Sequence, residues 1–124
     1  MNRPHTVLLV DSDPFFRRVY CSRLQKAGYE VLVARDAVEG SKLAGQHLPS
    51  AILCDVHTDN GRGLELVQAL GSSPKTSHIP VLCLSNTWQE EHKNAAFKAG
   101  AKGFLQKAQV TPTEVTAHIE SMLA

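Results

Sequence analysis

Residues 51–66 read AILCDVHTDNGRGLEL, and the fold class can be predicted from the pattern of this segment. The apolar run Ala51–Asp55 has the length of a buried strand and ends in a carboxylate. The sequence TDNG at residues 58–61 is a turn signal. Apolar residues then recur at helical spacing from Leu64 to Leu70. This stretch therefore predicts a strand, a turn and a helix, in that order.

The same alternation is repeated along the whole chain. Stretches with helical periodicity or capping signals separate short apolar runs, which is typical of parallel strands covered by helices on both faces. We therefore predict an α/β fold of the type (βα)5, with a doubly wound parallel sheet whose strands have the order 2-1-3-4-5. The five predicted strands are Thr6–Val10, Glu30–Ala34, Ala51–Asp55, Pro80–Ser85 and Lys102–Leu105.

Capping residues predict where the helices begin and end. A proline in the first turn, a small polar residue before it and a glycine after the last turn are the signals used. The predicted helices run from Pro14 to Gly28, from the N-cap Asp36 to His47, from about Leu64 to the loop 71–74, from about His92 to Gly100, and onward from the N-cap Thr111 with Pro112 in the first position.

Composition limits the possible functions. The chain has 124 residues, the size of one domain, so we expect residues 1–124 to form a single unit. Its formal net charge is +1, and no basic field suggests direct binding to nucleic acid. No apolar stretch of about 18 residues suggests a membrane span. The three cysteines show no CxxC or metal-site spacing, so a reducing cytoplasm is the expected location.

Two of the cysteines, Cys54 and Cys83, lie inside apolar runs and are expected to be buried core residues. Side chains alternate between the two faces of a sheet along each strand. If Asp55 and Ser85 face one pocket, the two thiols point to opposite faces. No disulfide between them is therefore expected.

Polar side chains follow four of the predicted strands. The first strand is followed by Asp11-Ser12-Asp13, the third ends in Asp55, the fourth ends in Ser85, and Lys107 follows the fifth. Each alone is weak evidence, because a strand-end aspartate is most often a turn or cap residue. The predicted strand order makes these four strands contiguous, so we expect the side chains to converge on one pocket at the carboxyl ends.

The chemistry of such a pocket points to phosphoryl transfer. Neighbouring carboxylates repel one another unless a cation neutralises them, and a hard ion with oxygen ligands, most simply Mg²⁺, would do so. A lysine and a hydroxyl supply the charge and the hydrogen bonds that a bound phosphoryl group needs. A carboxylate in this position can also be the nucleophile and form an aspartyl phosphate.

Four segments carry a resemblance to a known family. VLLVDSDP at residues 7–14, AILCDVHTDNGRGLEL at 51–66, VLCLS at 81–85 and AGAKGFLQKA at 99–108 together resemble the receiver domain of two-component response regulators. The resemblance covers essentially the whole chain and implies a flavodoxin-like fold. Within it, Gly63 matches the glycine that opens the third helix.

The resemblance also implies roles for individual residues. Asp55 matches the phosphate acceptor, and Asp11 belongs to the acidic Mg²⁺ pocket, which the backbone carbonyl of His57 completes. Lys107 matches the lysine that pairs with the phosphoryl group. The switch hydroxyl and the switch aromatic correspond to Ser85 and Phe104, although Phe104 is equally well explained as a permanently buried core residue.

The family also implies partners. A histidine kinase or a phosphotransfer protein would supply the phosphoryl group. Switching would alter the face made by the fourth helix, the fifth strand and the fifth helix, where a downstream protein would bind. The domain would be a signalling element rather than an enzyme, with at most self-catalysed phosphotransfer and dephosphorylation.

The sequence departs from the family at four positions. Ser12 replaces the second acid after the first strand, Asp59 and Ala108 replace prolines, and Asn86 replaces a small residue. Because a hydroxyl is a poorer Mg²⁺ ligand than a carboxylate, we expect weak Mg²⁺ binding and slow phosphorylation. Ser12 itself or the neighbouring Asp13 is a candidate further ligand. Without its proline, the Lys107–Ala108 bond loses the restraint that favours a cis peptide.

Two alternatives stay open. A phosphorylation-independent receiver would act purely as an interaction module. A haloacid-dehalogenase-type phosphatase would use Asp11 as its nucleophile, but the chain is short for that family and Asp55 would be left without a role. No output domain follows the last predicted helix, so the chain is expected to act through a partner or to be part of a longer protein.

Overall fold

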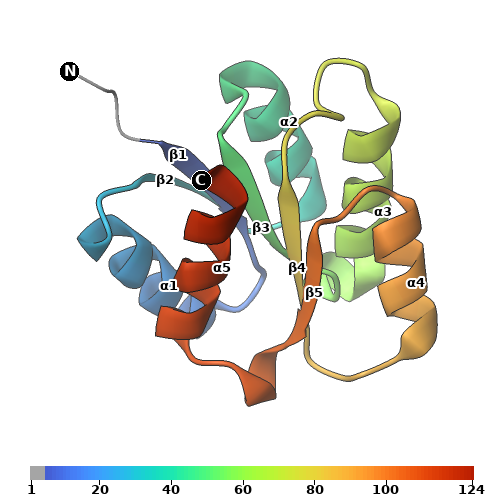
Figure 1. Ribbon diagram of the computed structural model, residues 1–124. Coiled ribbons are helices and arrows are strands. Elements are labelled where there is room, and N and C mark those ends of the chain that lie inside the picture. The colour runs from blue at the N-terminus through green and yellow to red at the C-terminus, as the bar shows by residue number, and fades with distance from the viewer. Residues whose placement is uncertain (1–4) are drawn as a thin grey trace.

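The computed structural model describes residues 5–124 and has an alternating strand-helix order (Figure 1). A short 3-10 helix, η1, lies between the last strand and the last helix. In chain order the elements are β1 (Thr6–Val10), α1 (Pro14–Lys26), β2 (Glu30–Ala34), α2 (Ala37–His47), β3 (Ala51–Asp55), α3 (Thr58–Ser72), β4 (Val81–Ser85), α4 (Glu90–Lys98), β5 (Gly103–Gln106), η1 (Lys107–Gln109) and α5 (Pro112–Leu123).

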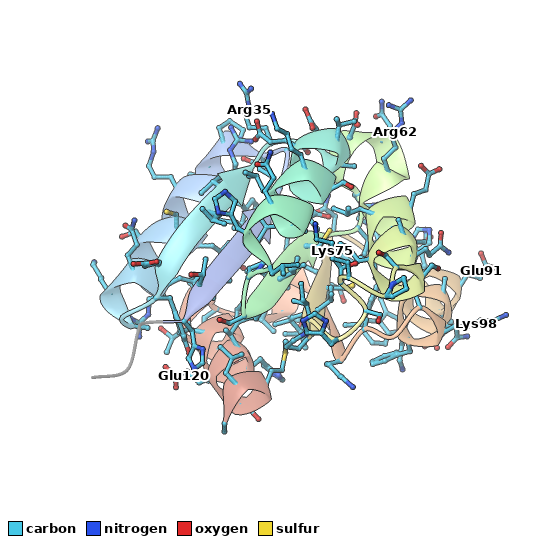
Figure 2. The ribbon with its side chains drawn as sticks, turned by 90° about the horizontal axis from the view of Figure 1, so that it is seen from above. Arg35, Arg62, Lys75, Glu91, Lys98 and Glu120 are labelled. Atoms are coloured by element: carbon cyan, nitrogen blue, oxygen red, sulfur yellow. The ribbon has the colours of Figure 1, made fainter. Side chains whose placement is uncertain are left out.

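The five strands form one parallel sheet in the order β2-β1-β3-β4-β5. This confirms the predicted (βα)5 fold and its strand order. Helices α1 and α5 cover one face, and α2, α3 and α4 cover the other, so the molecule has three layers (Figures 1 and 2). Because all five strands are parallel, their carboxyl ends lie at one edge, at the bottom of Figure 1.

Local capping explains where the helices begin. The Asp13 carboxylate accepts hydrogen bonds from the backbone N–H groups of Phe15 and Phe16, which fixes the start of α1. The predicted N-caps of α2 and α5 are confirmed, with Asp36 accepting from the Glu39 N–H and Thr111 forming a reciprocal capping box. Two predicted strands differ from the structure by one residue at their ends, where β4 begins at Val81 and β5 covers Gly103–Gln106.

The chain between β3 and the regular part of α3 makes the predicted turn. Asp59, Asn60 and Gly61 have φ values of 54°, 56° and 91°, so this part of α3 is left-handed rather than helical. Asparagine, aspartate and glycine tolerate that conformation best. The regular helix then begins at Gly63, whose α-carbon lies against the end of β3, because an added Cβ there would be 2.2 Å from the Asp55 carbonyl oxygen.

Each face of the sheet has its own apolar core. Leu8, Ile52 and Cys54 are among the residues that pack under α2, α3 and α4, whereas Leu53 and Leu84 pack under α1 and α5. This arrangement confirms the double-sided burial that the continuous apolar runs predict.

The predicted placement of the cysteines is wrong in one respect. Cys54 and Cys83 are fully buried and free, as expected, but they are register partners and lie in the same core. The register pairs Asp55 with Leu84, so Ser85 is one residue out of step with Asp55, and the premise that both face one pocket does not hold in this conformation. Burial raises the pKa of the Cys83 thiol to about 12, which keeps it protonated.

The end of the molecule opposite the carboxyl ends of the strands faces the viewer in Figure 2. Lys75, in the loop between α3 and β4, lies on this side, away from the carboxyl ends of the strands. Among residues 5–124, no helix has the length and apolar character needed to cross a membrane.

Candidate functional site at the carboxyl ends of the strands

The structure brings three charged side chains together at the predicted edge. Asp11 follows β1, Asp55 ends β3 and Lys107 begins η1. Their exposed fractions are only 1%, 4% and 7%, respectively. The Lys107 Nζ lies 2.8 Å from Oδ2 of Asp11 and 2.8 Å from Oδ2 of Asp55. The cluster therefore holds two buried carboxylates that share one ammonium group.

The electrostatics of this cluster follow from burial and from the shared lysine. Burial raises the pKa of Asp11, although hydrogen bonding from Lys107 and from the Asp13 N–H acts in the opposite direction. Burial alone would lower the pKa of Lys107, but its hydrogen bonds to Asp11 and Asp55 outweigh that effect and raise it. Lys107 is therefore firmly protonated at neutral pH and acts as an internal counter-ion.

An aromatic ring fixes the lysine from another side. The Lys107 Nζ lies 3.9 Å from the centroid of the Phe16 ring, a cation–π contact. Phe16 in turn stacks on Tyr20 at 5.9 Å between ring centroids. Helical spacing in the sequence does not reveal which cation an aromatic ring covers, so this contact of Phe16 was not predictable from the sequence.

The residues after β1 take separate positions. Ser12, at the position of the family's second acid, is exposed. Asp13 uses its carboxylate to cap α1, while its backbone N–H donates to Oδ1 of Asp11 at 2.9 Å. In this conformation neither side chain joins the pair of buried carboxylates.

Ser85 lies at the same edge but does not join the charged cluster. Its hydroxyl donates to the carbonyl of Thr87 and accepts from the Thr87 N–H at 3.2 Å. The His57 Nε2 lies 2.8 Å from the same oxygen. The contact between the His57 imidazole and Ser85 was not predictable from the sequence, because it depends on the three-dimensional path of two loops.

The aromatic residue Phe104 is buried, with an exposed fraction of 5%. Trp88 packs edge-on against it, with 5.9 Å between ring centroids. Trp88 is itself half exposed, at 47%, and lies in the loop between β4 and α4. The two rings therefore connect the loop that follows Ser85 to β5.

The donor set suits a hard cation but is small. The candidate ligands are the carboxylates of Asp11 and Asp55 and the carbonyl of His57, all of them oxygen atoms, which Mg²⁺ prefers. The His57 carbonyl also accepts the Gly61 N–H at 3.3 Å, which leaves one lone pair for a metal. Among the described residues no group of three or more His, Cys, Asp or Glu side chains forms a metal site. These oxygen ligands fit Mg²⁺, and because they are few, water would have to supply the remaining ligands.

Comparisons with known proteins identify the family of this chain. The family described as "Response regulator receiver domain" matches residues 7–120. The DNA-binding dual master transcriptional regulator RpaA of Synechocystis is 32% identical over 94% of this chain. This chain spans about half the length of that regulator (48%) and of the phosphate regulon regulator PhoB of Pseudomonas aeruginosa (51%).

Solved structures show the same fold over 98% of the chain. A putative response regulator from Chloroflexus aurantiacus has 32% identity and a TM-score of 0.88, with 98% of both chains covered. The chemotaxis protein CheY4 of Vibrio cholerae has 29% identity and a TM-score of 0.89, with 98% of this chain and 100% of that chain covered. The chain belongs to the response regulator receiver domain family of two-component signalling.

Proposed function

We propose that this chain is a phosphoacceptor receiver domain in which Asp55 accepts a phosphoryl group. The observation that carries the proposal is the joint burial of Asp55 with Asp11 and Lys107, whose Nζ lies 2.8 Å from both carboxylates. A buried acid at a strand end, beside a cation that is held in place, has what a nucleophile for phosphoryl transfer needs.

The proposed step is a transfer from a phosphohistidine of a histidine kinase or phosphotransfer protein. A carboxylate oxygen of Asp55 forms a bond to phosphorus while the P–N bond to the imidazole breaks. The imidazole leaves with the bonding electron pair and takes up a proton. Lys107 is placed to neutralise charge on the transferring oxygens, because its Nζ already contacts Asp55.

Mg²⁺ is the proposed cofactor. Asp11, Asp55 and the backbone carbonyl of His57 would hold it, and the bound ion would neutralise charge on the phosphoryl oxygens. Lys107 is bound to both carboxylates, so metal entry has to compete with an existing ion pair. Together with the neutral Ser12 side chain, this competition supports the expectation of weak binding.

The output is proposed to be a protein contact on the face of α4, β5 and α5. Phosphorylation would draw the Ser85 hydroxyl toward Asp55 and change the packing of the loop that carries Trp88. The cytoplasm is the proposed location, and a histidine kinase is the proposed source of phosphate, because the family belongs to two-component signalling.

The first experiment is a mass measurement. The protein is incubated with Mg²⁺ and a small acyl-phosphate donor, and its intact mass is read beside an Asp55→Asn control. We expect a gain of one phosphoryl group that is absent from the control. Phosphorylation elsewhere, seen as an equal gain in the control, would contradict the assignment of Asp55.

The second candidate function is a phosphorylation-independent interaction module. The observation that favours it is the pairing of Lys107 with both acids, which neutralises part of the cluster without any metal. No mass gain even at high Mg²⁺, together with partner binding that Asp55→Asn leaves unchanged, would establish this alternative.

A further inference from the structure

The Ser85 hydroxyl is completely engaged in the present conformation. Ser85 is fully buried, with an exposed fraction of 0%. Its oxygen contacts the Thr87 carbonyl, the Thr87 N–H and the His57 Nε2. A hydroxyl has one proton to donate and two lone pairs, so these three contacts use its whole capacity. Nothing remains with which Ser85 can bind another group.

The directions of these hydrogen bonds define the protonation of His57. The Thr87 carbonyl can only accept, so it takes the single hydroxyl proton of Ser85. The contact between the His57 Nε2 and the Ser85 oxygen, at 2.8 Å, then requires the imidazole to donate. All three contacts of Ser85 are hydrogen bonds only in the tautomer of His57 that carries a proton on Nε2.

The strand register places Ser85 on the side of His57. Cys83, two residues earlier on β4, points into the core under α2, α3 and α4, whereas Leu84 points into the core under α1 and α5. Ser85 follows the direction of Cys83 because side chains alternate along a strand. Asp55 is the register partner of Leu84 and points the other way. The hydroxyl must therefore move if it is to meet a group on Asp55.

A second histidine holds the ring of His57. His92, in the first turn of α4, packs edge-on against it, with 5.4 Å between ring centroids and 68° between ring planes. The Nδ1 of His92 is buried and has no hydrogen-bond partner among the described residues. The imidazole of His57 is thus confined between Ser85 on β4 and His92 on α4.

We propose that His57 is a positioning residue whose hydrogen bond holds the Ser85 hydroxyl in its present place, away from Asp55. The ring of His92 packs against His57 from α4 and restricts its movement. We call this arrangement of His57, Ser85 and His92 the lock. Resting on the function proposed above, release of this lock is the step that lets Ser85 approach a phosphoryl group on Asp55. The lock is built from side chains of this chain and joins the loop after β3 directly to the start of α4.

The resting part of the proposal can be tested without any phosphorylation. Long-range ¹H–¹⁵N NMR of the imidazoles in the native protein identifies which ring nitrogen of His57 carries the proton. We expect Nε2. A proton on Nδ1 with a bare Nε2 would overturn the proposal, because Ser85 would then have no donor in His57.

Two substitutions separate the hydrogen bond from the bulk of the ring. His57→Phe keeps a ring against His92 but removes the donor, whereas His57→Gln retains an N–H at a similar reach. The only tryptophan, Trp88, lies three positions after Ser85 and reports on this loop by fluorescence. We expect changed emission in His57→Phe and near-native emission in His57→Gln. Native emission in both variants would overturn the lock.

The switching part is tested by the rate of phosphorylation by a small acyl phosphate. His57→Phe lacks the hydrogen bond that holds Ser85 away from Asp55, so it should react about two- to tenfold faster than the native protein. His57→Gln keeps a donor for this hydrogen bond and should react at about the native rate. His78→Phe, at an exposed histidine on the opposite edge, is the matched control and should leave the rate unchanged.

The outcomes distinguish this proposal from the function on which it rests. An unchanged or slower rate in His57→Phe would overturn the role of the lock in switching. If the native protein takes up no phosphate at all, the proposed function fails, whereas the tautomer and the Trp88 emission still decide whether His57 positions Ser85.

Discussion

Because Ser12 is neutral, the charge of the cluster at the carboxyl ends of the strands comes from Asp11, Asp55 and Lys107. The two buried carboxylates and the one ammonium group give it a formal charge of about −1, where an acid at position 12 would make it more negative. Since Lys107 bridges Asp11 and Asp55 directly, the proposed Mg²⁺ would have to compete with Lys107 for both carboxylates. The exposed hydroxyl of Ser12 does little to attract that ion.

Replacing Ser12 by aspartate should strengthen Mg²⁺ binding. The added carboxylate supplies both a negative charge and a hard oxygen ligand, so we expect the dissociation constant to fall on the order of tenfold. The measurement is a Mg²⁺ titration followed by Trp88 fluorescence or by calorimetry.

The matched control is Ser12→Asn, which has nearly the size of aspartate without its charge. Its affinity for Mg²⁺ should stay close to the native value. Equal or weaker binding by Ser12→Asp would mean that this position does not contribute to metal binding.

At this scale the sequence predicts the convergence of residues better than their contacts. The meeting of Asp11, Asp55 and Lys107 follows from topology, because the carboxyl ends of contiguous parallel strands lie at one edge. The hydrogen bonds of Ser85 were not predictable, because they depend on the register of β4 against β3 and on the path of the loop after Asp55. The packing of Phe16 on Lys107 depends on a rotamer, which helical periodicity does not specify.

Among the elements, α3 shows how closely a helix can approach the end of β3. Its regular part begins at Gly63, where an added Cβ would lie 2.2 Å from the Asp55 carbonyl oxygen and 3.0 Å from backbone atoms of Val56. The resemblance to the family predicts a glycine here, and the structure provides the physical reason.

Gly63→Ala should therefore destabilise the protein by about 1–3 kcal/mol, because backbone atoms rather than a flexible side chain have to move. Gly45→Ala is the control, since Gly45 lies within α2 and an added Cβ there has no atom within 4 Å. That substitution should stabilise the protein by about 0.5–1 kcal/mol through helix propensity. Urea denaturation measures both, and equal effects at the two sites would contradict the steric explanation.

Element types and order were predictable from the sequence, whereas some element ends were not. The N-caps Asp36 and Thr111 were predicted correctly, because a side-chain oxygen before a helix accepts a hydrogen bond from a backbone N–H in the first turn. The ends of β4 and β5 differ by one residue because pairing with neighbouring strands, rather than hydrophobicity, determines where a ladder stops.

For the molecule as a whole, Lys107 joins segments that lie far apart in the sequence. Its ammonium contacts the ends of β1 and β3 and the face of α1, so it links the sheet to one helical layer. Both carboxylates that it neutralises are almost fully buried. Removing the cation leaves them facing one another without compensation, which is strongly destabilising in a buried site.

Lys107→Met, which keeps much of the side-chain length, should lower the free energy of unfolding by about 3–5 kcal/mol at neutral pH. Lys102→Met, at an exposed lysine that precedes β5, is the matched control and should stay within about 0.5 kcal/mol of the native protein. Urea denaturation at several pH values gives both results. A loss of equal size in the two variants would show that the charge of Lys107 is not what stabilises the fold.

The pH dependence identifies the cause of the loss. In the native protein the pKa of Lys107 lies above its ordinary value of 10.5, so its stabilising effect is complete below pH 10.5 and is lost as the pH rises through the folded pKa. In Lys107→Met, the cost comes from ionised carboxylates. Burial already raises the pKa of Asp11, so this cost is present above that pKa and is relieved as the pH falls through it. The difference in stability between variant and native protein should therefore shrink on acidification, and a difference that stays constant with pH would point to lost packing on Phe16 instead.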